Sequence, residues 1–147
     1  MSRILTYKGQ LEMGAEEKIH LSTNDGLTGY RIKNFNMISS TPGKNSAEYV
    51  GQIFLKSQAA TITDAVDFSN TDLLAVDFLN HDTNPAYVSS QLIIFDNETF
   101  NQDIFVYIVD ASGNTVPCNY YLELEQFKID LNTSTFHTLK NIRSTTQ

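Results

Sequence analysis

The chain has 147 residues, a formal net charge of −7 and a sequence pI near 4.7. This length is enough for one hydrophobic core. A hydrophobic content of 41%, with 11% aromatic residues, argues against global disorder. The acidic balance excludes electrostatic capture of a nucleic-acid backbone, which needs clustered basic residues. We therefore predict a single β-sandwich domain over residues 1–147 that binds no nucleic acid, from the strand patterns described next.

Neither the N-terminal residues nor the cysteine content indicates secretion. Residues 1–7 lack the apolar run of a signal peptide, and no stretch approaches the run of about 18 apolar residues that a membrane helix needs. Cys118 is the single cysteine, so the fold does not depend on an internal disulfide. No basic residue adjoins Cys118, and its thiol is predicted to be inert. We expect synthesis in a cytoplasm and no membrane association.

Apolar residues recur at every second position along most of the chain, which is the pattern of β-strands. Runs rich in Asn, Asp, Gly and Pro separate these segments and predict turns. Together the patterns predict strands at residues 3–13, 18–22, 28–39, 47–56, 73–80, 86–95 and 103–110.

The strand over 28–39 changes parity along its length. Tyr30 and Ile32 occupy one parity, whereas Phe35 and Met37 occupy the other. One extra residue in a strand re-aims the side chains that follow it. The sequence therefore predicts a β-bulge or bend near Lys33 and Asn34.

Residues 101–130 are predicted to form one long β-hairpin. Its first strand, over 104–109, is almost continuously apolar, as expected for a central strand that is buried on both faces. In the second strand, leucines at 122 and 124 give way to apolar residues of the opposite parity from position 127 onward. This switch predicts a second bulge near Glu125 and Gln126.

The C-terminal segment, 132–147, is the one region in which a helical turn is predicted. A hydroxyl residue within 133–135 could cap it, and Leu139 and Ile142 could cover the edge of the core.

About eight short strands, with turns every 8–12 residues or so, predict an all-β fold. We expect an antiparallel β-sandwich, jelly-roll-like, with a short C-terminal helical turn. An immunoglobulin-like sandwich is the alternative, because strand patterns do not determine the order of strands in each sheet.

The histidines, His20, His81 and His137, do not follow a metal-binding spacing. The pair His81-Asp82 lacks an activated nucleophile nearby and matches an ordinary turn. Aspartates also fall five residues apart, at positions 67, 72, 77 and 82. On a strand this spacing alternates faces, so these aspartates are not expected to form one cluster.

Glu123 and Glu125 share a face of their strand, as paired catalytic carboxylates could. They alternate with leucines, which more simply indicates the solvent-facing side of a sheet. Tyr107 and the pair Tyr120-Tyr121 lack basic neighbours and suit a protein interface better than a nucleic-acid platform. We predict no catalytic, cofactor-binding or metal-binding residues.

Two segments resemble small structural proteins of tailed bacteriophages, especially those of short-tailed phages of marine bacteria. They are GLTGYRIKNFNMI at 26–38 and CNYYLELEQFKIDLNTSTFHTLKNIRS at 118–144. The resemblance implies a non-enzymatic virion protein of the capsid decoration or cement type. It also implies contacts with the major capsid protein or another virion protein, and a homo-oligomeric arrangement in the particle. It carries no catalytic residues over to this chain.

Two other functions remain open on the sequence. A carbohydrate- or receptor-binding module of a tail would need exposed aromatic residues with Asn or Asp beside them. A hydrolase on a jelly-roll scaffold would need a carboxylate pair or a metal cluster in a concave face.

Overall fold

The computed structural model contains nine strands and one helix within the residues that it describes. These residues are the whole chain except Met1, Asn45, 59–62, Asp64, 82–88, Asn97 and Gln147, and the side chains of His81 and 140–146 are not described either. The elements are β1 (Arg3–Leu11), β2 (Glu16–Ile19), β3 (Thr28–Ser39), β4 (Ala47–Phe54), β5 (Leu73–His81), β6 (Ser89–Ile94), β7 (Thr99–Phe100), β8 (Ile104–Asp110), β9 (Cys118–Lys128) and α1 (Leu131–Thr146).

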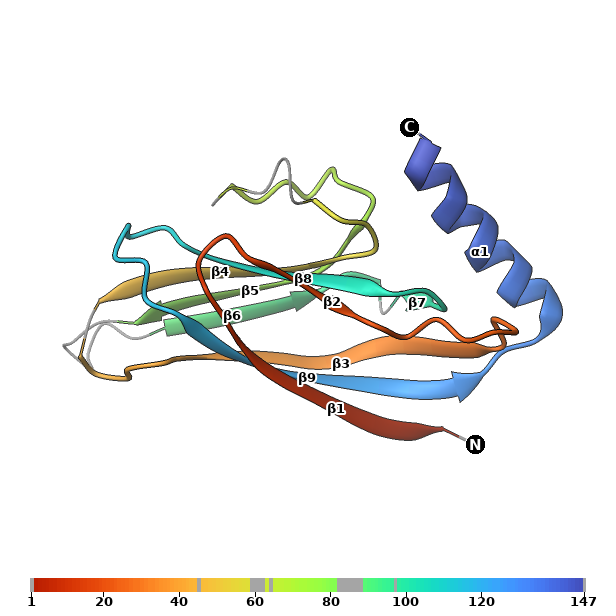
Figure 1. Cartoon of the computed structure of the whole chain (residues 1–147), viewed down its shortest axis with the longest axis horizontal. Coiled ribbons are helices and arrows are strands. Elements are labelled where there is room, and N and C mark those ends of the chain that lie inside the picture. The colour runs from red at the N-terminus through yellow and green to blue at the C-terminus, as the bar shows by residue number, and fades with distance from the viewer. Residues whose placement is uncertain are drawn as a thin grey trace.

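The strands form two antiparallel sheets that pack against each other, with α1 at one end (Figure 1). The strand order is β1-β9-β3-β7 in the four-stranded sheet and β2-β8-β4-β5-β6 in the five-stranded sheet. Four strand pairs are nested in the sequence, each inside the one before it: β1/β9, β2/β8, β3/β7 and β4/β5. Successive pairs belong alternately to the four-stranded and the five-stranded sheet, as in a long antiparallel ribbon that is rolled up. This is the jelly-roll order. The predicted antiparallel jelly-roll sandwich is confirmed, and β6 extends one sheet edge.

The strand predicted over 28–39 is β3, and its bulge lies where the sequence predicts it. The pairing of β3 with β9 shifts between Ile32 and Asn34, so that Lys33 is the extra residue. Ile32 and Phe35 both face the core as a result, although one is at an even and the other at an odd position.

The predicted start of a strand at 86–88 and the predicted turn at 82–85 lie outside the described residues.

Residues 101–130 do not form a hairpin, so that prediction is wrong. β8 belongs to the five-stranded sheet and β9 to the four-stranded sheet, and residues 111–117 carry the chain from one to the other. Alternating apolar residues specify which face of a strand is buried but not which strand lies beside it. The prediction of a central β8 is correct, because β8 pairs with both β2 and β4 and is buried over most of its length.

The second predicted bulge, near Glu125 and Gln126, is also absent. β9 pairs with β1 and β3 in unbroken register through both residues. The change of parity has another cause, because Phe127 lies on the outer face of the sheet. The guanidinium carbon of Arg31 lies 4.9 Å from the centre of the Phe127 ring, a distance at which the cation and the ring attract each other.

The main hydrophobic core fills the space between the two sheets. Phe35 and Leu122 enter it from the four-stranded sheet, and Ile108 enters it from the five-stranded sheet. The sheets pack so closely at Gly51 that a Cβ there would lie 2.6 Å from the sulfur of Met37. A side chain at this position would force the core apart.

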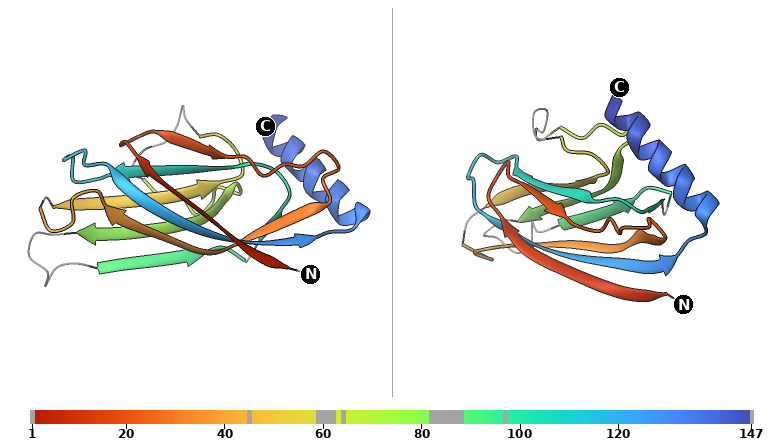
Figure 2. Two further views of the ribbon diagram at one scale, coloured as in Figure 1. Left: turned by 60° about the horizontal axis from the view of Figure 1, so that its bottom comes forward. Right: turned by 45° about the vertical axis from the view of Figure 1, so that its right-hand side comes forward.

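The outer faces of the two sheets differ (Figure 2). The described parts of residues 55–72 lie over the outer face of the five-stranded sheet. The Tyr107 hydroxyl donates a hydrogen bond to the Glu16 carboxylate and accepts one from the Gln58 amide, which fastens this segment to β2 and β8. No described segment covers the outer face of the four-stranded sheet. A second apolar cluster, on the covered side, comprises Phe54, Leu73, Val76 and Tyr107.

Candidate interaction surface on the C-terminal helix

Helix α1 begins directly after Asp130, which caps its N-terminus. The Thr133 amide donates to the Asp130 carboxylate at 2.7 Å, and the Ser134 amide donates to the Asp130 carbonyl oxygen at 2.9 Å. The first of these hydrogen bonds lowers the pKa of Asp130, and a negative charge is favourable at this end of a helix. The predicted cap within 133–135 is wrong, because those residues already form the first turn. The helix is also longer than the predicted turn.

The side of α1 that faces the sandwich is polar. Ser134 is buried, and its hydroxyl donates to the carbonyl oxygen of Gly26 at 2.7 Å. Asn101, which follows β7, is 1% exposed. Its side-chain amide lies 3.1 Å from the Gly26 carbonyl oxygen, 3.4 Å from the Ser134 carbonyl oxygen and 3.2 Å from the Thr138 hydroxyl. A buried amide with these acceptors fixes the rotation of the helix about its own axis.

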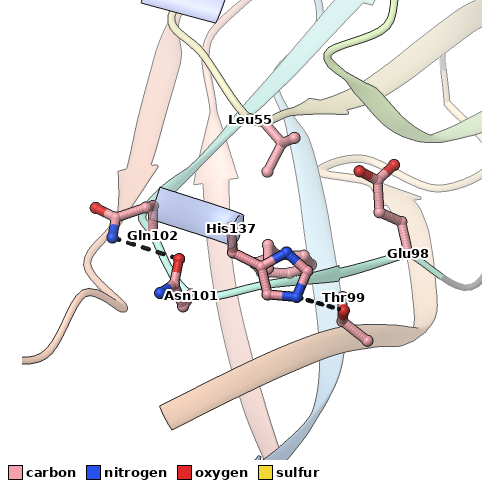
Figure 3. Close-up of a pocket in the computed structure, with 7 residues that line it drawn as sticks. Leu55, Glu98, Thr99, Asn101, Gln102 and His137 are labelled. Atoms are coloured by element: carbon pink, nitrogen blue, oxygen red, sulfur yellow. Dashed lines mark hydrogen bonds between the residues drawn. The ribbon is translucent and has the colours of Figure 1, made fainter. Parts of the chain in front are cut away.

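His137 adds a further contact at the same junction (Figure 3). Its ring points from the helix toward Thr99, and the Nε2 atom lies 2.9 Å from the Thr99 hydroxyl. Leu55, Glu98 and Asn101 line the small hollow beside it, whose volume is about 10 Å³. That volume is about the size of a single water molecule. This junction is a joint between helix and sandwich, and not a pocket for an organic ligand.

The side of α1 turned away from the sandwich carries two exposed apolar residues, Phe136 and Leu139, which are 62% and 49% exposed. Leu131, in the first turn, is 70% exposed, and we call these three residues the outer helix face. Amphipathic helices normally turn their apolar side toward the core. Here the polarity is inverted, because the buried hydroxyl and amide contacts hold the polar side inward.

The prediction that Leu139 covers the core edge is therefore wrong. Thr138, one residue earlier, faces the Asn101 amide, and a helix rotates by about 100° per residue. Leu139 is thus turned away from the sandwich. The side chain of Ile142, predicted to accompany it, lies outside the described part of the structure.

The three histidines considered in the sequence lie in different parts of the fold. His20 is exposed and lies 3.9 Å from Asp103, whereas His137 is part of the helix junction and His81 ends β5. Among the described residues, no three His, Cys, Asp or Glu side chains are placed to share a metal ion. Nor does any helix in this part of the chain have the length and apolar character to cross a membrane.

Glu123 and Glu125 lie on the outer face of the four-stranded sheet, as the sequence predicts. Glu125 is partly buried and has cationic partners on both sides, with Arg31 at 3.2 Å and Lys33 at 3.7 Å. The two glutamates therefore belong to a mixed-charge surface in which one carboxylate is already paired.

Asp77 is a polar residue of the core whose burial the sequence analysis did not predict. It is 4% exposed and points between the sheets from β5, and no described residue donates a hydrogen bond to it. Burial raises the pKa of Asp77 to about 6. The position of Asp77 in its strand could have indicated this burial, because Ala75 and Leu79, two residues away on either side, point to the same face and are core residues.

Cys118 lies in the same interior and has no exposed surface. Burial, together with the charge of Asp77, raises the pKa of its thiol to about 12. The thiolate is therefore essentially absent at neutral pH, which supports the prediction of an inert thiol.

The fold and this surface define an all-β jelly-roll protein that carries an inverted amphipathic helix at one end of its sandwich. Comparison with protein-family models and with curated proteins finds no match. The functional interpretation therefore depends on the surfaces of the molecule.

Proposed function

We propose that the protein is a non-enzymatic structural component of a virion that decorates or cements the capsid through protein–protein contacts. The outer helix face carries this proposal, since exposed apolar patches bordered by polar residues mark interaction sites. The buried hydrogen bonds of Asn101 and Ser134 hold the helix in place before any partner arrives. Docking a preorganised helix costs little conformational entropy.

The resemblance of residues 26–38 and 118–144 to small phage structural proteins supports the choice of a virion. The second segment includes most of α1, and the first contains Gly26, to which the helix is anchored. A capsid presents many equivalent sites, so that a weak contact per copy is multiplied across the particle. The proposed partner is the major capsid protein or another virion protein.

The double variant Phe136→Ser, Leu139→Ser is expected to bind capsid particles at least about tenfold more weakly than the wild type. Each substitution removes an exposed apolar side chain from the docking surface, where hot-spot residues contribute most of the affinity. The measurement is co-sedimentation with purified particles from which this protein has been stripped. A urea melt should show nearly unchanged stability, because neither side chain is buried in the sandwich.

The matched control is Ile38→Ser, which removes an equally exposed apolar side chain from the outer face of the four-stranded sheet. It should bind like the wild type. Equal binding by all three proteins would remove the helix from the docking surface, and absence of wild-type binding would contradict a capsid role. Mass spectrometry of intact virions would separate a capsid protein, with hundreds of copies, from a tail protein with about six or twelve.

A second candidate function is a carbohydrate- or receptor-binding module in a tail. The open face of the four-stranded sheet supports it. Tyr121 is 39% exposed there, between its cross-strand partners Lys8 and Asn36. The side chains of Gln10 and Asn119 lie one row away and share a hydrogen bond of 3.1 Å. Aromatic rings and amides can contact the C–H and hydroxyl groups of sugars, but one exposed ring makes a small platform.

Under this second function, Tyr121→Ala should abolish retardation of the protein in gels that contain neutral polysaccharides. The ring supplies the apolar contact that hydrogen bonds alone would not replace. Thr6→Ala, at the edge of the same face, serves as the control and should keep the wild-type mobility shift. A wild-type protein that migrates normally in every such gel would eliminate this function.

A further inference from the structure

A hollow of about 340 Å³ lies between the turns at 67–73 and the turn that joins β6 to β7. That volume is within the range of sites that bind small organic groups. Its described lining combines aromatic, acidic, amide, hydroxyl and aliphatic side chains and includes no basic one: Phe68, Asn70, Thr71, Leu73, Phe95, Asp96 and Glu98. None of these residues belongs to the outer helix face, so the hollow is a separate candidate for binding.

Two aromatic rings form the apolar part of the hollow. Phe95 is half-buried and packs against the second apolar cluster on the outer side of the five-stranded sheet. The Phe68 ring packs on Phe95 edge to face, with ring centres 5.0 Å apart and ring planes at 74°. This contact holds the Phe68 ring in place. Phe68 nevertheless remains 61% exposed, so most of its surface is open to a ligand.

The backbone that carries Phe68 is held by hydrogen bonds. The Ser69 amide donates to the Asp67 carboxylate at 2.9 Å, and the Asn70 amide donates to the Asp67 carbonyl oxygen at 3.2 Å. The Asp72 amide in turn donates to the side-chain oxygen of Asn70 at 2.9 Å. Such turns fix the chain locally. The ring is therefore positioned before a ligand arrives, which lowers the entropic cost of binding.

The charge around the hollow favours a cation. Asp96 is exposed, Glu98 is half-buried, and both line the hollow. Asp67 stands next to Phe68 in the chain, and a hydrogen bond from the Ser69 side chain lowers the pKa of its carboxyl group, so that it is ionised at neutral pH. The net charge of −7 adds to the negative potential. The face of an aromatic ring also attracts cations.

The other sheet shows which cation suits such a place. On it, the guanidinium carbon of Arg31 lies 4.9 Å from the centre of the Phe127 ring, and its Nη2 atom lies 3.2 Å from the Glu125 carboxylate. In the hollow, Phe68 and Asp96 supply the same two partners, a ring and a carboxylate, without a basic side chain among the described lining residues. A guanidinium matches both, because it stacks on rings and donates in its plane to carboxylates.

We propose that this hollow, which we call the Phe68 site after its most exposed ring, binds an arginine side chain of a partner protein. Glu98 lines both the Phe68 site and the small hollow beside His137 (Figure 3), so the site adjoins the junction with α1. The inference deepens the proposed function, on which it rests for the identity of the partner. It assigns to the capsid contact an arginine that enters the Phe68 site beside the outer helix face.

The test is an NMR titration of the isolated protein with N-acetylarginine amide. The probe should shift the backbone amide signals of Phe68, Asn70 and Asp96. N-acetylcitrulline amide has nearly the same shape but no charge, and it should bind at least about tenfold more weakly. Raising NaCl from about 0.05 M to about 0.5 M should weaken the binding of the arginine probe, because salt screens the attraction between charges.

Variants of the site separate the ring from the carboxylate. Phe68→Ala and Asp96→Asn should each weaken the arginine probe at least about threefold, whereas Phe68→Tyr keeps a ring and should bind like the wild type. Asp96 has a φ of 53°, which Asn also tolerates, so Asp96→Asn removes the charge and keeps the backbone. The controls are Phe78→Ala, a partly exposed ring outside the hollow, and Glu123→Gln on the other sheet. Both should bind the probe like the wild type.

Co-sedimentation with the stripped capsid particles distinguishes failure of the site from failure of the proposed function. Phe68→Ala should bind particles at least about threefold more weakly than the wild type and Phe78→Ala. Equal binding of the arginine and citrulline probes, or tighter binding of methyl glucoside, would overturn the inference and leave the capsid role standing. A wild type that binds the arginine probe selectively but binds no particle would refute the capsid role and not the site. Selective probe binding with unchanged particle binding by Phe68→Ala would overturn the assignment of the arginine to the capsid.

Discussion

Replacing Asp77 by Asn is expected to raise the free energy of unfolding at neutral pH by about 2 kcal/mol. Asp77 lies between the sheets, is 4% exposed, and has no hydrogen-bond donor among the described residues. Ionising it there is unfavourable, which is why its pKa rises from 3.8 to about 6. A shift of two units corresponds to about 3 kcal/mol. Asn should recover most of this, although its amide is also buried.

The same shift determines how stability depends on pH. Because the folded-state pKa of Asp77 lies above its unfolded value, the folded protein binds more protons between about pH 4 and pH 6. Stability should therefore increase as the pH falls through this window. Asp25, Asp67, Asp103 and Asp130 have lowered pKa values and lose stabilisation as the pH falls further, below about 4.

Urea melts of the wild type and the Asn variant at a series of pH values measure both effects. The wild type should become more stable from about pH 7 to pH 5, whereas Asp77→Asn should change little. Cys118, the ionisable neighbour of Asp77 in the interior, should not contribute to this window, because burial raises the pKa of its thiol to about 12. A less stable Asn variant at neutral pH would show that the carboxylate has a partner.

The sequence predicted most of the fold because the relevant signals are local. The alternation of apolar and polar residues predicted the bounds of β3, β4, β5 and β8 to within about two residues. The switch of apolar residues from even to odd positions within β3 predicted the bulge at Lys33. The partner of each strand could not be predicted in this way. Residues 111–117 have the composition of a hairpin turn, yet they cross between sheets, because the nested pairing of the whole ribbon decides where β8 and β9 lie.

The interaction surface was predicted only as a helix, and with the wrong rotation. Leu139 and Ile142 are three residues apart, a spacing typical of a core-facing stripe. The actual orientation depends on Asn101 and on the carbonyl group of Gly26, which are distant from the helix in the sequence. No local pattern contains that information. The burial of Asp77, by contrast, could have been inferred from the parity of its strand.

Replacing Ile108 by Ala should lower the free energy of unfolding by about 3 to 5 kcal/mol, the largest loss that we expect. Ile108 is completely buried on the inner face of β8, and its truncation would leave a cavity that the close contact of the two sheets at Gly51 cannot fill by collapse. Urea melts should show this as a lower midpoint with an unchanged slope.

Phe105 provides the comparison within the same strand. It points to the outer face of β8 and is only partly buried, with the Lys18 ammonium 6.0 Å from its ring centre. Phe105→Ala should therefore cost about 1 to 2 kcal/mol, less than Ile108→Ala although the side chain is larger. Glu123→Gln, on the other sheet, should change stability by less than about 1 kcal/mol. If Phe105→Ala proved as destabilising as Ile108→Ala in the isolated protein, the outer face of β8 would have to be covered more completely than the described segments cover it. An additional loss that appears only at high protein concentration would instead place β8 in a contact between copies.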